Sequence, residues 1–239
     1  MVSIIRRAFR RYLVRRLGIP EIPPALERLR ANNFQPSNIF DVGAYSGEFA
    51  KLCRGIWPNA KLVCFEVLPQ RVVELRNWCA QDGNAVLLET LLGSERSPTV
   101  PFYEMETASS VLEEHTPQVA SVKCYPMQTI DEIVKSEQAR IPTFLKLDVQ
   151  GYELEVLKGA QNTLSQISVV LAEVNLIDIH KGAPLMDELV LFMSNEGFVT
   201  YDICGLTRRP LDNALWQADF IFVRRESPLR SDRRWQAAG

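Results

Sequence analysis

A segment near residue 40 most strongly constrains what this chain can fold into. Residues 38–42 form a short, mostly apolar segment, and two glycines follow it at Gly43 and Gly47. The apolar side chains of residues 48–56 then have helical spacing. Glycine frees the backbone for a sharp turn and for close approach of a ligand. The pattern therefore predicts a strand, a tight turn and a helix in direct succession.

An acidic residue ends the next predicted strand. Residues 61–65 form this strand, in which residues 62–65 are apolar, and Glu66 follows it 19 residues after Gly47. In a strand–turn–helix–strand unit, an acid at this place can accept hydrogen bonds from ribose hydroxyls. The two features together predict a pocket for a nucleotide-like cofactor.

The glycine spacing indicates which cofactor this is. Dinucleotide sites have G-x-G-x-x-G, whereas this turn has G-x-x-x-G, and the chain contains no G-x-x-x-x-G-K-[ST]. The turn with its acid resembles the S-adenosylmethionine site of Rossmann-like methyltransferases. In that resemblance the amino-acid part of the cofactor lies over the glycine turn, and Glu66 holds the ribose. The alternative is an ordinary strand–helix turn that contains two glycines.

Residues 144–160 closely resemble the signature of the FkbM family of methyltransferases, K-x-D-V-E-G-x-E-x-x-V-L-x-G-A. The resemblance extends over roughly residues 36–224. Gln150 stands where the family usually has Glu, and Tyr45 stands where Asn is common. Other matching pieces are Asp41–Ala44, Ser109–Ser110, Thr129–Ile133, Glu173–Val174 and Asp219–Val223.

Alternating strands and helices predict a mostly parallel sheet with helices on both faces. The resemblance implies the α/β Rossmann-like fold of class I methyltransferases, with a seven-stranded sheet whose last strand is antiparallel. Residues 93–121 are expected to be irregular, with a short strand at 99–103. Strands are predicted near 38–42, 61–66, 85–89, 143–148, 168–174, 198–203 and 218–224, and helices near 25–32, 47–56, 69–82, 130–138, 152–164 and 185–196.

Charge divides the chain into three parts. Residues 1–16 contain six arginines and no acid, although the whole chain has a net charge of −2. We expect a basic arm and linker at 1–24, a methyltransferase domain at 25–224 and a basic tail at 225–239. The domain between the basic ends is acidic, and this argues against nucleic acid as a partner.

The amino-terminal arm also bears on where the protein acts. Residues 1–17 form a basic amphipathic pattern that could lie on an anionic membrane surface. The alternative is a solvated arm or an oligomer contact. The five cysteines are scattered, which is typical of reduced thiols in the cytosol, and no apolar run reaches the ~18 residues needed to span a bilayer. We expect a cytoplasmic protein, with peripheral contact at the inner membrane surface left open.

Ligands of such sheets lie beyond the carboxyl ends of the strands. The first strand end offers Asp41, which would organise the turn or contact the cofactor's ammonium group. The alternative for Asp41 is a residue bonded only to its local backbone. The predicted cofactor-binding residues are Asp41, Gly43, Ala44, Ser46, Gly47, Glu66, Leu92 and Asp148.

Asp148 is also predicted to act in catalysis, because it ends the fourth strand beside the expected sulfonium. Its alternative is capping of the following helix. His180 and His115 are the candidates for a general base, although a loop histidine is often an ordinary surface residue. Asp148, Glu173 and Asn175 offer oxygen ligands for Mg²⁺, but they lack the local spacing of a metal site, and hydrogen-bonded strand ends are the favoured explanation. We therefore expect no metal.

The resulting prediction is an S-adenosylmethionine-dependent methyltransferase. The family resemblance favours O-methylation of a sugar hydroxyl in a glycan, a glycolipid or a secondary metabolite, with a small-molecule, sugar or lipid-linked acceptor. Alternatives are an N-methyltransferase of protein or peptide and a cofactor-binding protein without turnover. An NAD-dependent oxidoreductase is disfavoured by the glycine spacing.

Overall fold

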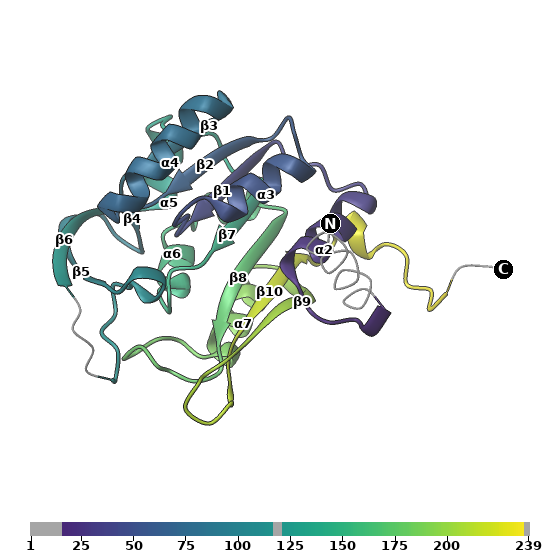
Figure 1. Ribbon diagram of the computed structural model, residues 1–239. Coiled ribbons are helices and arrows are strands. Elements are labelled where there is room, and N and C mark those ends of the chain that lie inside the picture. The colour runs from purple at the N-terminus through teal and green to yellow at the C-terminus, as the bar shows by residue number, and fades with distance from the viewer. Residues whose placement is uncertain (1–15, 117–120, 237–239) are drawn as a thin grey trace, which may run out of the picture.

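The computed structural model describes residues 16–116 and 121–236 (Figure 1). Most of the basic arm, residues 1–15, lies outside the described residues, so the membrane prediction for 1–17 stays a prediction. No helix in these two ranges is both long and apolar enough to cross a membrane.

The main sheet has seven strands. Its order is β3 (Ala85–Leu88), β2 (Lys61–Phe65), β1 (Asn38–Val42), β7 (Phe144–Leu147), β8 (Val169–Asn175), β10 (Leu215–Arg224) and β9 (Phe198–Arg208). Pairing is parallel from β3 to β8, whereas β10 runs antiparallel to both of its neighbours. This confirms the predicted mostly parallel sheet and its antiparallel last strand.

Helices cover both faces of the sheet (Figure 1). The helices α2 (Ile22–Ala31), α3 (Glu48–Ile56) and α4 (Pro69–Asp82) pack on one face, and α5 (Ile130–Lys135), α6 (Glu153–Lys158) and α7 (Met186–Asn195) pack on the other. Side chains alternate between the two cores, because successive strand residues point to opposite faces. In β1, for example, Ile39 joins the core under α2 to α4, and Phe40 joins the core under α5 to α7.

Two helices differ from their predicted limits. α2 begins at Ile22, inside the expected linker, because Pro23 and Pro24 fall in its first turn, where a backbone N–H has no helical partner. The helix predicted over 152–164 ends at Lys158 and is followed by a 3₁₀ turn at Leu164–Gln166.

A second, three-stranded sheet has one strand inside the segment 93–121 that was expected to be irregular and one strand at each end of it. It contains β4 (Leu91–Leu92), β5 (Ser97–Glu104) and β6 (Ser121–Gln128), with β6 in the middle. The predicted strand at 99–103 corresponds to β5, but β6 was not predicted. Met127 is the only buried side chain of β6, so this strand lacks the buried apolar face by which a strand is recognised in a sequence.

Candidate active site

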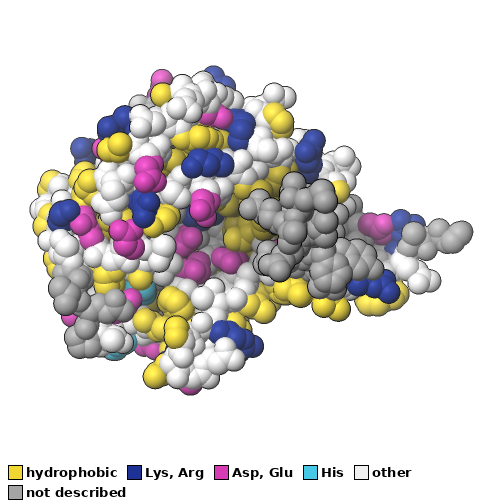
Figure 2. All heavy atoms as spheres, in the orientation of Figure 1, with side chains coloured by type: hydrophobic (Ala, Val, Ile, Leu, Met, Phe, Trp, Pro, Cys, Tyr) yellow, Lys and Arg dark blue, Asp and Glu magenta, His cyan; other side chains and the backbone are white. Residues whose placement is uncertain are grey.

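A cavity of about 820 Å³ lies at the carboxyl ends of β1, β2, β7 and β8. Acidic side chains gather around a hollow on the face shown in Figure 2. The cavity brings together most of the predicted cofactor residues, because parallel strands end at the same edge of the sheet. These residues are Gly43, Ala44, Ser46, Glu66, Leu92 and Asp148.

The two glycines of the turn have different roles. Gly43 has φ +71°, and a Cβ atom there would lie 1.9 Å from the backbone oxygen of Asp148. Gly43 therefore lets the ends of β1 and β7 pack directly together. Gly47 has φ +78° and precedes α3, but it does not line the cavity; a Cβ there would meet Leu75 at 2.6 Å.

The backbone at Tyr45 is compatible with the Asn that the family resemblance implies at this position. Its φ of +48° lies in the left-handed region, which Asn tolerates better than most residues. Here the hydroxyl of Tyr45 donates to Glu106 over 3.0 Å and accepts from Arg71, whose guanidinium carbon lies 4.1 Å from the ring centroid. These contacts join the glycine turn to the segment around Glu106, which forms another part of the cavity wall.

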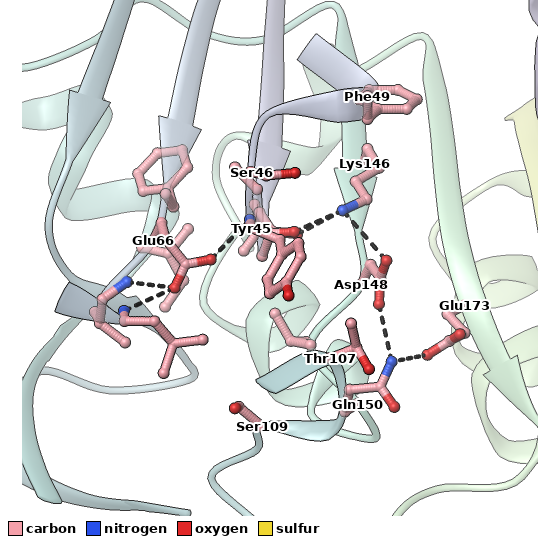
Figure 3. A pocket seen from close by; sticks show the side chains of 18 of the residues that line it. Tyr45, Ser46, Phe49, Glu66, Thr107, Ser109, Lys146, Asp148, Gln150 and Glu173 are labelled. Carbon is pink, nitrogen blue, oxygen red and sulfur yellow. Dashed lines mark hydrogen bonds and ion pairs between the residues drawn. The ribbon is translucent and has the colours of Figure 1, made fainter. Parts of the chain in front are cut away.

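Glu66 is held by three backbone N–H groups. Its Oε1 accepts from Val67 and Leu68 over 2.7 and 2.8 Å, and its Oε2 accepts from Tyr45 over 2.7 Å (Figure 3). Burial raises the pKa of Glu66, and the three N–H groups oppose this rise. A carboxylate has about four acceptor sites, so roughly one remains on Oε2 for a ligand hydroxyl.

Lys146 connects the ends of β1 and β7 at the base of the site. Its ammonium lies 3.1 Å from Asp41 and 3.5 Å from Asp148, and it donates to the carbonyl oxygen of Gly43 over 2.8 Å. Burial acts to lower the pKa of Lys146, but attraction to the two acids outweighs it and raises the pKa above its ordinary value. Asp41 is fully buried and does not line the cavity. It is placed to hold Lys146, and this placement is inconsistent with the predicted contact between Asp41 and a cofactor ammonium.

An amide bridges the acids at the ends of β7 and β8. The Nε2 of Gln150 donates to Oδ1 of Asp148 over 3.0 Å and to Oε2 of Glu173 over 2.8 Å (Figure 3). Gln217 donates to the same Glu173 oxygen over 2.7 Å and to Asn175 over 3.2 Å. The three residues considered as Mg²⁺ ligands are thus engaged by side-chain amides. Within the described ranges, no group of three or more His, Cys, Asp and Glu side chains is arranged to hold a metal.

Glu153 fixes the loop that carries Asp148 and Gln150. It is fully buried, and it accepts from the backbone N–H groups of Val149 over 2.9 Å and Gly151 over 3.1 Å. Burial raises the pKa of Glu153 to about 7. Its place in the first turn of a helix is visible in the sequence, but its role as an internal acceptor depends on the tertiary fold.

Neither histidine lines the cavity. His180 is fully buried, and its Nε2 lies 3.8 Å from Glu114. Burial lowers the pKa of His180. The side chain of His115 is 58% exposed and lies 3.9 Å from Asp178. The predicted role of either histidine as general base needs contact with an acceptor, and these placements do not provide it.

One part of the cavity wall had only a weak signal in the sequence. The segment around residues 105–111 contributes Glu106, Thr107 and Ser109 to the lining. The neighbouring Ser110 donates to the backbone oxygen of Gln150 over 2.8 Å, so this segment is attached to the loop after β7. The serine pair at 109–110 in the family resemblance was the one indication that this irregular stretch belongs to the site.

The cavity fits the predicted cofactor. Its volume lies in the usual range for small-molecule sites. Backbone 43–46 and a free acceptor site on Glu66 lie on one side, and Leu68, Leu91 and Phe102 supply apolar surface. The glycine turn and Glu66 would hold the amino-acid and ribose parts of S-adenosylmethionine.

Comparisons with known proteins identify the family of this chain. Residues 41–200 match the family of methyltransferase FkbM domains. The hexuronic acid methyltransferase AglP of Haloferax volcanii is 29% identical over 192 residues, which cover 79% of this chain and 71% of AglP.

Solved structures with a similar fold include two methyltransferases. Methyltransferase FkbM from Methylobacillus flagellatus has 19% identity and a TM-score of 0.48, and the match covers 77% of this chain but only 43% of that protein. Magnesium protoporphyrin IX methyltransferase (ChlM) from Synechocystis, solved with bound S-adenosylmethionine, has 10% identity and a TM-score of 0.48, with 84% and 76% covered. The chain belongs to the FkbM methyltransferase domain family and is an S-adenosylmethionine-dependent methyltransferase.

Proposed function

We propose that this methyltransferase acts on a sugar hydroxyl, in a glycan, a glycolipid or a secondary metabolite. The observation that carries the proposal is the composition of the cavity. The cofactor turn and Glu66 lie on one side, and the carboxylates and amide of Asp148, Gln150 and Glu173 lie on another. Such groups suit the many hydroxyls of a sugar. The sugar acceptor in the name of the relative from Haloferax volcanii supports the same class.

The residues of the chain would act mainly by positioning. When bound, S-adenosylmethionine supplies a methyl group already activated by its sulfonium. The backbone at 43–46 and Glu66 would fix the donor, and alignment alone can supply roughly 7–11 kcal/mol of the barrier. Asp148 would place negative charge near the cation, since its Oδ2 faces Lys146 and its Oδ1 is held by Gln150.

The charge of the cavity favours a cationic donor. Among the described residues that line the cavity, Lys146 is the only lysine or arginine, and its ammonium is already paired with Asp41 and Asp148. The acids of the lining are Glu48, Glu66, Glu106, Asp148 and Glu173.

The acceptor class can be tested with methyl-labelled S-adenosylmethionine. The protein is incubated with the donor and with extracts separated into glycan, lipid, small-molecule and protein pools. Label in a carbohydrate of the first three pools supports the proposal. Label in protein identifies the N-methyltransferase alternative, and cofactor binding without label in any pool indicates a binding protein. The Asp148→Asn variant should keep the fold and transfer methyl more slowly.

We also propose that residues 25–224 form the catalytic domain and that 1–17 contact anionic membranes. The protein should sediment with anionic vesicles at low salt, less at high salt, and not with neutral vesicles, because attraction to anionic lipid is screened by ions. Full-length protein that stays in the supernatant under all three conditions would remove the membrane role.

A further inference from the structure

We propose that Glu173 is the general base that takes the proton of the acceptor hydroxyl, so that the product is a methyl ether and not a methyl ester. The inference deepens the proposed function and rests on it. It assigns the role of general base to Glu173, a role that neither the sequence pattern nor the family comparison assigns to this residue.

The first support is the way Glu173 is held. It lies near the carboxyl end of β8 and lines the cavity. Its Oε2 accepts from the side-chain amides of Gln150 and Gln217, over 2.8 and 2.7 Å. Its Oε1 accepts no hydrogen bond from any residue that the structure describes. One oxygen is therefore anchored twice, and the other is available to an acceptor hydroxyl (Figure 3).

The second support is that the other acids of the cavity lining either have hydrogen-bond or ion-pair partners or lie at an exposed position. Asp148 has one oxygen bonded to an amide and the other facing an ammonium. Glu66 accepts from three backbone N–H groups. Glu106 is paired with Arg71 at 2.8 Å. Glu48 is exposed at the start of α3. Glu173 combines a sheltered position with an unoccupied oxygen.

The third support is electrostatic. Burial raises the pKa of Glu173 well above its ordinary value, and the negative charges of Asp148, Glu153 and Asp219 raise it further, against a lowering by Lys146. A carboxylate with a raised pKa binds a proton more strongly and is a better general base near neutral pH. The two amide donors on Oε2 stabilise its charged form, which must be present before the reaction.

These positions allow the following methyl-transfer step. The acceptor oxygen forms a bond to the methyl carbon while the carbon–sulfur bond of the bound donor breaks, and the electron pair of that bond stays on sulfur. The hydroxyl proton moves to Oε1 of Glu173 and is released to water after the product leaves. A carboxylate acceptor has no proton to lose and needs no base. It would also be repelled by the acids of this cavity.

The test compares Glu173→Gln with Asp219→Asn. Asp219 is the register partner of Glu173 on β10, and its pKa is also raised by burial, but it does not line the cavity. The assay uses methyl-labelled donor with neutral methyl hexopyranosides and, separately, with the corresponding hexuronic acids. Label should enter an alkali-stable ether. Glu173→Gln should lower kcat by about 100-fold or more, with cofactor affinity kept, because a general base contributes about 10²–10⁴-fold. Asp219→Asn should stay within a few-fold of wild type at pH values above the acid limb, and its acid limb should move to lower pH, because the charge of Asp219 raises the pKa of Glu173.

The pH profile distinguishes a base from a structural residue. In the wild type, kcat should fall as the pH drops through the raised pKa of Glu173, because the protonated form accepts no proton. This acid limb should be absent from the residual activity of Glu173→Gln. An alkali-labile ester as the product, or a Glu173→Gln variant within three-fold of wild type, would overturn the proposal.

A carboxyl titration tests the role of Glu173 even if no sugar of the panel is labelled. The absence of label in every sugar would count against the sugar acceptor and not against Glu173. In protein labelled with ¹³C at the glutamate carboxyls and saturated with S-adenosylhomocysteine, Glu66 and Glu153 should have a raised pKa, and a further resonance, that of Glu173, should titrate well above the ordinary range for Glu. It should be missing in Glu173→Gln and present in Asp219→Asn. A Glu173 resonance that titrates in the ordinary range would contradict the role of Glu173 as base.

Discussion

The side-chain amide of Gln150 donates a hydrogen bond to the carboxylate of Glu173 over 2.8 Å, and the same nitrogen reaches Asp148. A neutral donor thus stands between two acids at a position where the family usually has Glu. It lets the ends of β7 and β8 carry two carboxylates side by side, because it satisfies both of them without adding charge.

Replacing this amide by an acid should destabilise the protein at neutral pH. In Gln150→Glu both partner carboxylates lose a donor and gain a negative neighbour, so we expect a loss of about 1–3 kcal/mol in the free energy of unfolding. The loss should shrink at lower pH, where the added carboxyl is protonated. Urea unfolding at pH 7 and pH 5 measures the loss at neutral pH and its reduction at lower pH. Gln166→Glu makes the same change at an exposed position and should have little effect. Equal stability of Gln150→Glu and wild type at pH 7 would contradict the bridge.

Lys146 should contribute to stability as the partner of Asp41. Removing it in Lys146→Met leaves a fully buried carboxylate without its counter-ion, which typically costs 3–5 kcal/mol. The double variant Asp41→Asn with Lys146→Met should recover part of the loss, since no buried charge is then left at position 41. Chemical denaturation of the two single variants and the double variant gives the coupling. Additive losses would show that the pair does not act as a unit.

Glu66 should affect both cofactor affinity and the turn. Glu66→Ala removes the acceptor of three backbone N–H groups and the site available to a ribose hydroxyl. We expect S-adenosylmethionine to bind more weakly by about 1.5–3 kcal/mol, measured by isothermal titration calorimetry. Glu196→Ala, at an exposed position outside the cavity lining, is the control and should bind nearly as well as wild type. An unchanged dissociation constant in Glu66→Ala is not compatible with a ribose contact at this residue.

Glu153 should make the stability depend on pH. Its pKa is raised to about 7 by burial, whereas an unfolded Glu has a pKa near 4.3. The folded state therefore binds a proton that the unfolded state has released, and stability falls as the pH rises through this window, by roughly 3 kcal/mol in total. Glu153→Gln should flatten this part of the profile, as measured by unfolding between pH 4.5 and 7.5. Parallel profiles of variant and wild type would mean that Glu153 does not titrate there.

Gly43 should be required by the fold and not only by the cofactor. A methyl group in Gly43→Ala would meet the Asp148 carbonyl at 1.9 Å. Gly83 provides the matched control, because it has a similar φ of +73° but nothing within 4 Å of an added Cβ. Gly83→Ala should cost about 1–2 kcal/mol from the left-handed backbone alone, and Gly43→Ala about 1–3 kcal/mol more from overpacking. Thermal unfolding without cofactor compares the two variants. Equal losses of stability would show that β7 moves away from the added methyl group without an energetic cost.

Much of the sheet was predictable because its strands are buried on both faces. Short, mostly apolar segments such as 38–42 and 61–65 indicate buried strands, and Pro69 and Gly83 mark the limits of α4. The carboxyl-end rule then placed Glu66 and Asp148 in one cavity. β6 could not be predicted in the same way, because its side chains are mostly exposed and it is defined by its pairing with β5.

The sequence by itself determined the order of strands and helices, the glycine turn and the acids at strand ends, because these depend on local pattern. Only the tertiary structure decided what each acid contacts. Asp41 and Glu153 became internal partners of Lys146 and of backbone N–H groups, whereas Glu173 kept an oxygen free of described partners. The reason is that burial and pairing arise between segments far apart in the chain, and these set the pKa of a carboxylate and its access to a ligand.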